Sequence, residues 1–118
     1  MDSYRQFLGF RLDNRIYYFP LDYVQEVIKP VKSTKVPFTP DYVLGVFNLK
    51  GNILPLVDVK KKLFLTETKI DDDSRIIILD KDGYKFGILV DKLGDILRLE
   101  SLNDTDIDIL DINKLLIE

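Results

Sequence analysis

The chain has 118 residues, of which 46% are hydrophobic and 31% are charged, and its formal net charge is −3 at pH 7. It contains no cysteine, no histidine and only four serines, which excludes disulfides, thiolate and imidazole metal sites, and Ser-His or Cys-His nucleophiles. This inventory disfavours an enzyme, and the negative charge disfavours nucleic acid as a partner.

The pattern of apolar residues does not indicate a membrane protein or a secreted one. The apolar runs are only a few residues long, so no direct membrane insertion is expected. The N-terminal MDSYRQFLGF lacks the apolar core of a secretory signal, and the absence of cysteine fits a reducing compartment, so we expect a cytoplasmic protein. No cofactor and no metal are expected, because the acidic run 71–73 lacks the central glycine and final glutamate of a calcium loop.

The first predicted element is a β-hairpin over residues 7–21 (FLGFRLDNRIYYFPL), in which two apolar runs flank a polar turn. The next segment, VQEVI (24–28), is too short for its periodicity to separate a strand from a helical turn. If it is extended, Val24 and Glu26 share one side. If it is helical, Val24 and Val27 share one face instead.

A second hairpin is predicted over residues 43–59 (VLGVFNLKGNILPLVDV), with Lys50-Gly51 at its tip. Gly45 and Gly51 are expected to serve the backbone, as a bulge or close approach and as a turn with positive φ. Asn48 either satisfies backbone groups near the turn or makes a polar contact at a recognition groove. Lys50 is either a solvated tip residue or a basic contact.

The clearest hairpin covers residues 75–91 (RIIILDKDGYKFGILVD), because Asp82-Gly83 is a favoured tight-turn pair. A further strand is predicted at 92–100, which brings the total to about eight or nine short strands and favours an all-β fold of barrels. Five aromatic residues are expected in the core rather than on a base-stacking surface: Phe10, Tyr17, Phe19, Phe47 and Phe86.

Two segments that break the β pattern resemble each other. LVDVKKKL (56–63) aligns without gaps on ILDINKLL (109–116), and in each a strand end reaches an aspartate that can cap a helical turn, Asp58 or Asp111. The lysines at 60–62 are expected on the solvated side of the first turn. The chain thus contains two similar halves of about sixty residues, each marginal alone, which should share a hydrophobic seam.

The order of these segments resembles the CheW-like chemotaxis coupling-protein family over nearly the whole chain, from about Phe7 to Leu116. The matching segments are FLGFRLDNRIYYFPLDYVQEVI, VPFTPDYVLGVFNLKGNILPLVDVKKKL, RIIILDKDGYKFGILVDKLGDILRL and LDINKLL. The resemblance implies one domain over residues 1–118, built from two intertwined SH3-like five-stranded β-barrels with a shared core and short helical turns.

The resemblance also implies a non-catalytic scaffold. Such proteins couple the cytoplasmic tip of transmembrane methyl-accepting chemoreceptors to the chemotaxis histidine kinase, in arrays at the membrane, and dock on the kinase's own homologous regulatory domain. The implied receptor- and kinase-binding residues come from three separate segments: Val24, Glu26, Val27, Asn48, Lys50, Gly51, Val90 and Asp91.

The chain departs from the family pattern at two places. The family's Asn-Leu-Arg-Gly is here Asn48-Leu49-Lys50-Gly51, which keeps the charge but loses the planar fork of arginine. The segment before the closing DILDINKLL is also shorter than usual, so one barrel is expected to lack a strand or loop and to expose an edge. This leaves two alternatives open: a stand-alone SH3-like interaction module outside chemotaxis, and an enzyme using Asp58 or Asp91, which are better explained as a helix cap and a strand-end residue.

Overall fold

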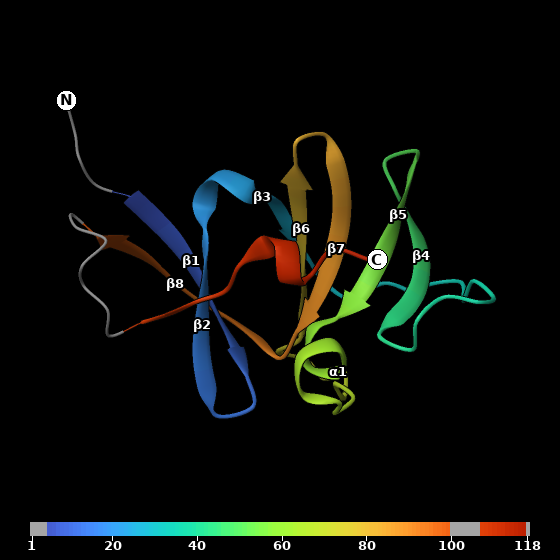
Figure 1. The fold of residues 1–118 in the computed structure, drawn as a ribbon, viewed down its shortest axis with the longest axis horizontal. Coiled ribbons are helices and arrows are strands. Elements are labelled where there is room, and N and C mark those ends of the chain that lie inside the picture. Colours follow the sequence, from blue (N-terminus) through green and yellow to red (C-terminus); the bar gives the residue numbers. More distant parts are fainter. Residues whose placement is uncertain (1–4, 100–106, 118) are drawn as a thin grey trace.

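The computed structural model describes residues 5–99 and 107–117, and Figure 1 shows two twisted β-sheets lying side by side. The elements in chain order are β1 (Arg5–Leu12), β2 (Arg15–Pro20), η1 (Leu21–Tyr23), β3 (Val24–Ile28), β4 (Val43–Leu49), β5 (Asn52–Asp58), α1 (Val59–Phe64), β6 (Arg75–Lys81), β7 (Tyr84–Val90), β8 (Lys92–Leu99), β9 (Asp108–Ile109) and η2 (Ile112–Lys114).

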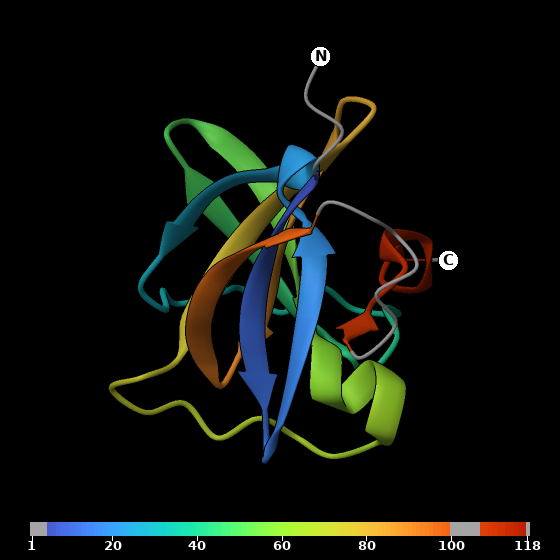
Figure 2. The same cartoon turned by 90° about the vertical axis from the view of Figure 1, so that its left-hand side faces the viewer.

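The described residues form nine strands in two sheets, which confirms the all-β prediction. The first sheet has the order β8-β1-β2-β9, and the second has the order β3-β6-β7-β5-β4. Figure 2 faces the first sheet and shows β8 and β2 on either side of β1. All three predicted hairpins are present, as β1–β2, β4–β5 and β6–β7. The ambiguous segment at 24–28 is a strand, because it pairs with β6 at the edge of the second sheet.

The two halves of the chain exchange strands. In the second sheet the β6–β7 hairpin carries β3 antiparallel on one side and β5 parallel on the other. In the first sheet the β1–β2 hairpin carries β8 antiparallel and β9 parallel at the equivalent positions. Each hairpin is therefore completed by strands from the other half of the sequence, which accounts for the intertwined arrangement.

The sheets meet on a shared core built from equivalent positions of the two hairpins. Both hairpins have two-residue turns, so counting back from each turn aligns Phe10 with Leu79 and Tyr17 with Phe86. The core residues contributed by the two hairpins are Leu8, Phe10, Tyr17 and Phe19 from one, and Ile77, Leu79, Phe86 and Ile88 from the other. The predicted aromatic core is confirmed, since all five residues are buried.

The second sheet closes into a barrel through the segment that precedes β4. Thr34 and Val46 exchange two backbone hydrogen bonds, with N···O distances of 2.8 and 2.9 Å. Gly45 permits this contact, because a Cβ atom there would lie 2.4 Å from the Thr34 carbonyl oxygen, and its φ is +148°. The predicted backbone role of Gly45 is thus a close approach at a bulge.

The first sheet has four strands among the described residues, fewer than the five that the resemblance implies, as expected from the shortened segment before the C-terminal turn, and no described segment takes the place of β4. In the second sheet, the Phe47 ring from β4 covers Gly87, 3.0 Å from an ideal Cβ position. The residue equivalent to Gly87 in the first sheet is Tyr18, and its own ring covers Gly9 at 2.9 Å. A side chain therefore fills the space that a strand fills in the other half.

Because a side chain replaces a strand here, we predict that the Tyr18 ring stabilises the first sheet. Tyr18→Ala should lower the free energy of unfolding by about 2 kcal/mol, because a half-buried aromatic ring is lost. Tyr18→Phe keeps the ring and should stay within about 0.5 kcal/mol of wild type. Urea unfolding of both variants measures this difference, and equal losses would show that the hydroxyl, not the ring, stabilises the half.

The two predicted helical turns follow the repeated aspartates. Asp58 accepts a hydrogen bond from the Lys61 N–H and two from Thr68, and Asp111 accepts one from the Asn113 N–H. Both predicted N-caps are confirmed. In the described part of the chain, no helix has the length and apolar character needed to cross a membrane.

Candidate functional site

Two of the predicted site residues form an ion pair across the seam of the second barrel. Lys50 Nζ lies 3.0 Å from Glu26 Oε2, although β3 and the β4–β5 hairpin belong to opposite edges of the sheet. The pairing arises because the sheet curls until its edges meet. The Lys50 side chain is 77% exposed, whereas that of Glu26 is only 26% exposed.

The second oxygen of the Glu26 carboxylate, Oε1, is buried and has no hydrogen-bond partner within residues 5–99 and 107–117. An unsatisfied buried acceptor destabilises a fold, and an exposed ion pair contributes little in return. Fold stability alone therefore does not explain a glutamate at position 26.

Lys50 is presented by a tight turn that Asn48 and Gly51 shape. Lys50 has φ +52° and Gly51 has φ +90°, as in a two-residue type I′ hairpin turn. The Asn48 side-chain oxygen accepts a hydrogen bond from the Gly51 N–H at 2.9 Å. The β6–β7 hairpin repeats this arrangement, since Asp80 accepts from the Gly83 N–H at 2.9 Å. Asn48 thus makes the local turn contact that was one of its two expected roles.

The remaining β3 candidates lie on an edge strand beside this pair. Val24 and Val27 are half-buried and pack on the shared core. A register shift between Val24 and Glu26 separates them, so Glu26 does not continue the simple alternation of the strand. The structure therefore brings together a charged pair and two half-buried valines at one edge of the second sheet.

The structure places Val90 and Asp91, which the resemblance also implied as binding residues, away from this edge of the second sheet. Val90 has 0% exposure and belongs to the shared core, so its side chain offers no surface to a partner. Asp91 follows the end of β7 that pairs with Arg75, whereas the Lys50 turn lies at the opposite end of the sheet, as Figure 1 shows. Strand register, which the sequence did not reveal, separates the two groups.

Asp91 belongs instead to a cluster with buried Lys60 and exposed Asp13, here called the Lys60 cluster. Lys60 Nζ lies 2.8 Å from Asp13 Oδ1 and 3.1 Å from Asp91 Oδ2, and the Asp13 N–H donates to Asp91 Oδ2 at 2.6 Å. Burial lowers the pKa of Lys60, but the hydrogen bonds and negative charges of the two carboxylates outweigh it and raise that pKa. The cluster joins the β1–β2 turn to α1 and to the end of β7.

The prediction that Lys60 lies on the solvated side of its helix is wrong. Its side chain is only 7% exposed, because it shares the inward face of α1 with Val59 and Leu63. The predicted Asp58 cap already carried this information, since positions 59, 60 and 63 fall on one side of a helix that begins after residue 58. The sequence pattern of three consecutive lysines obscured it.

Comparisons with known proteins agree with this architecture. The family model of the CheW-like domain matches residues 6–113. The chain is 38% identical to the chemotaxis protein CheW of Helicobacter pylori over 103 residues, covering 87% of this chain and 61% of that protein. It is 33% identical to the chemotaxis protein CheW of Bacillus subtilis over 90 residues, covering 76% of this chain and 58% of that protein.

A solved structure of a related protein has the same fold. The crystal structure of the scaffolding protein TtCheW from Thermoanaerobacter tengcongensis superposes with a TM-score of 0.77 at 33% identity, covering 88% of this chain and 71% of that one. The chain spans about three fifths of the length of the two CheW proteins it matches. The match of the family model, the sequence identity and the superposition together show that the chain belongs to the CheW-like domain family.

Proposed function

We propose that this chain is a non-catalytic adaptor that couples the cytoplasmic tip of chemoreceptors to the regulatory domain of the chemotaxis histidine kinase. Membership of the CheW-like family supports the proposal, since its relatives include proteins named for chemotaxis and for scaffolding. On this proposal the whole chain, residues 1–118, acts as one domain in the cytoplasm at receptor arrays, and needs no cofactor.

The observation that carries the receptor half of the proposal is the Glu26–Lys50 pair on the edge of the second sheet. Val24 and Val27 lie on the same edge strand and pack on the shared core, but each keeps part of its surface exposed. The strand therefore offers some apolar surface together with one charged pair. A helix docks in such a place by burying apolar side chains, while the charges set its register. The Glu26 oxygen that has no hydrogen-bond partner within the described residues supports a role of this residue in recognition.

A charge swap separates recognition from folding. Lys50→Glu and Glu26→Lys each place like charges together, whereas the double variant restores the ion pair with its direction reversed. Lys50→Glu should keep the free energy of unfolding within about 1 kcal/mol of wild type, because Lys50 is largely exposed. The two variants that change Glu26 should remain folded but lose more stability, because that side chain is only 26% exposed. Receptor binding should weaken at least fivefold in all three, since a partner reads the sign of each charge.

Co-sedimentation with receptor-containing membranes and purified kinase measures binding, and thermal unfolding measures folding. Full recovery of receptor binding in the double variant would show that the pair only supports the fold. If the wild-type chain binds neither protein where a longer family member binds both, the adaptor proposal is wrong.

A second candidate function is an interaction module outside chemotaxis. The two-residue strand β9 is one of the two edge strands of the first sheet among the described residues, and both of its residues are exposed. Such an edge can accept a strand from another protein. A solution dimer formed through β9, together with indifference to the kinase, would favour this function over the adaptor.

A further inference from the structure

The loop of residues 29–42, here called the Phe38 loop, carries an aromatic side chain that the fold does not use. Phe38 is fully exposed, at 106% of its reference area, and its φ is +64°. A phenylalanine in this backbone region is strained by roughly 1 kcal/mol, and the exposed ring gains no burial in return. Neither packing nor backbone preference therefore accounts for Phe38.

The loop restrains the backbone around Phe38. Pro37 directly precedes Phe38 and Pro40 follows two residues after it, so both restrict the backbone around Phe38. The Thr39 hydroxyl donates to the Val36 carbonyl at 2.8 Å, and the Thr34–Val46 pair ties the start of the loop to β4. An aromatic ring presented by a rigid loop binds with little loss of conformational entropy.

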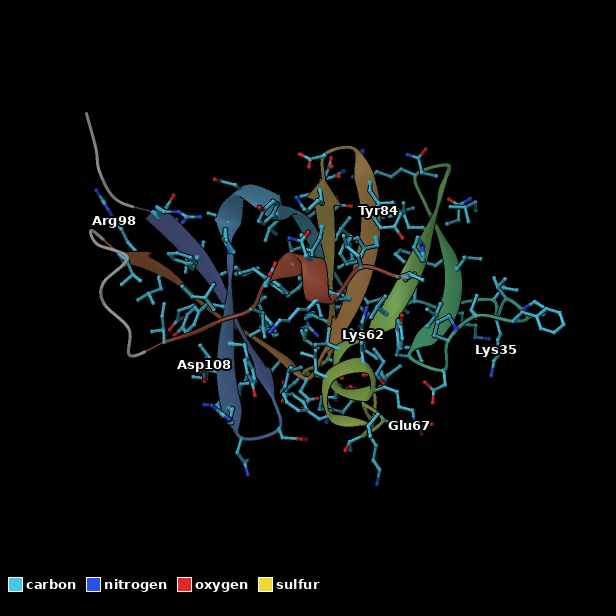
Figure 3. The ribbon with its side chains drawn as sticks, viewed as in Figure 1. Lys35, Lys62, Glu67, Tyr84, Arg98 and Asp108 are labelled. Carbon is cyan, nitrogen blue, oxygen red and sulfur yellow. The ribbon has the colours of Figure 1, made fainter. Side chains whose placement is uncertain are left out.

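The same loop concentrates positive charge. Lys29, Lys32 and Lys35 are exposed, and none of them forms an ion pair with the parts of the chain that the structure describes. In Figure 3, Lys35 lies at the end of the molecule farthest from the first sheet, beyond β4. A basic projection on a chain with net charge −3 is complementary to an acidic partner.

We propose that the Phe38 loop is the kinase-docking element of this chain, with Phe38 entering an apolar pocket bordered by carboxylates on the kinase's regulatory domain. This inference rests on the proposed adaptor function. A projecting ring requires a concave receiving site, which a folded domain can supply. The receptor contact is instead proposed at the edge strand β3, beside the Glu26–Lys50 pair.

A second copy of the chain is the alternative occupant. Its groove between β5 and β7, of about 440 Å³, is lined by Lys85 and by no carboxylate, so it would repel the lysines of the loop. Another hollow, of about 360 Å³, is lined by four carboxylates (Asp13, Glu67, Asp71 and Asp91) beside two lysines. Self-association is therefore measured separately from kinase binding.

The chain provides a matched control for testing Phe38. Leu65 is also apolar, 80% exposed and at positive φ (+62°), but it ends α1 rather than lying in the loop. Asparagine tolerates positive φ, so Phe38→Asn and Leu65→Asn should each keep or raise the melting temperature. Only Phe38→Asn should weaken binding to the purified regulatory domain, by at least tenfold, while binding to a receptor cytoplasmic fragment stays unchanged.

A second variant tests the charge. Lys32→Glu combined with Lys35→Glu should weaken kinase binding and remove most of its dependence on salt, again without affecting receptor binding. Isothermal titration at two salt concentrations measures the kinase affinity, the receptor affinity and their dependence on salt. Both partners are taken from the organism that supplies this chain. Circular dichroism confirms that each variant is folded.

The possible results are distinct. Kinase affinity of Phe38→Asn within twofold of wild type overturns the inference and leaves the adaptor function standing. Equal weakening of receptor and kinase binding also overturns it, as does a change confined to self-association in sedimentation velocity. A wild-type chain that binds neither partner rejects the adaptor function and this inference together.

Discussion

Replacing Lys60 with alanine is expected to lower the free energy of unfolding by about 3 kcal/mol, although the residue is a lysine in a run of lysines. The substitution leaves Asp91 without its cation and removes a buried aliphatic stem. Lys61→Ala is the matched control, because among the described residues Lys61 pairs only with the exposed Asp41 at 3.7 Å, and it should cost about 0.5 kcal/mol. Urea unfolding measures both, and equal losses would contradict the role of the Lys60 cluster.

The Lys60 cluster also predicts how stability depends on pH. The folded state raises the pKa of Lys60 above its ordinary value of 10.5, so the folded protein binds this proton more tightly than the unfolded chain does. The stabilisation that charged Lys60 gives the folded state is fully present below pH 10.5 and is lost as the pH rises through the raised pKa of the folded protein. Wild type should therefore lose more stability than Lys60→Met between pH 9 and pH 11.5, as measured by chemical unfolding.

Because the cluster joins the β1–β2 turn to the end of β7, its loss should weaken both halves together. Fluorescence and far-ultraviolet circular dichroism should give coincident unfolding curves in wild type and in Lys60→Ala. Separated transitions would show that the two sheets fold independently.

Gly45→Ala is expected to be at least as damaging, with a loss of about 3 to 4 kcal/mol. The new methyl group would lie 2.4 Å from the Thr34 carbonyl oxygen, and the alanine would also occupy φ +148°. The backbone at Thr34 and Lys35 must then move, which opens the seam of the barrel and displaces the start of the Phe38 loop. Kinase binding should consequently fall as well.

Gly51→Ala is the control for Gly45→Ala. It measures the cost of backbone strain alone, whereas Gly45→Ala combines backbone strain with a steric collision. Gly51 also has positive φ, +90°, but no atom lies within 4 Å of the position that a Cβ would occupy. Its substitution should cost only the backbone strain, about 1 kcal/mol. Thermal unfolding of the two variants side by side measures the difference, and similar losses would show that the close approach at Thr34 adds nothing.

The elements that the sequence determined by itself are those whose signals are local. Two-residue turns at Asp82-Gly83 and Lys50-Gly51 specify hairpins, because few residues tolerate positive φ. Asp58 and Asp111 mark helix starts, because a carboxylate one residue before a helical turn accepts its free N–H groups. The family resemblance depended on the order of these same local features.

The tertiary structure alone decided which residues meet. Glu26 and Lys50 lie on opposite edges of one sheet and pair only because that sheet curls closed. Lys60 is buried because α1 packs its inward face at the junction of the sheets, and Val90 is buried because β7 runs through the shared core. These outcomes depend on contacts between residues far apart in the chain, where neither turn chemistry nor periodicity carries information. The same limit applies to Phe38, whose exposure and strain became visible only once the loop was seen to project from the closed barrel.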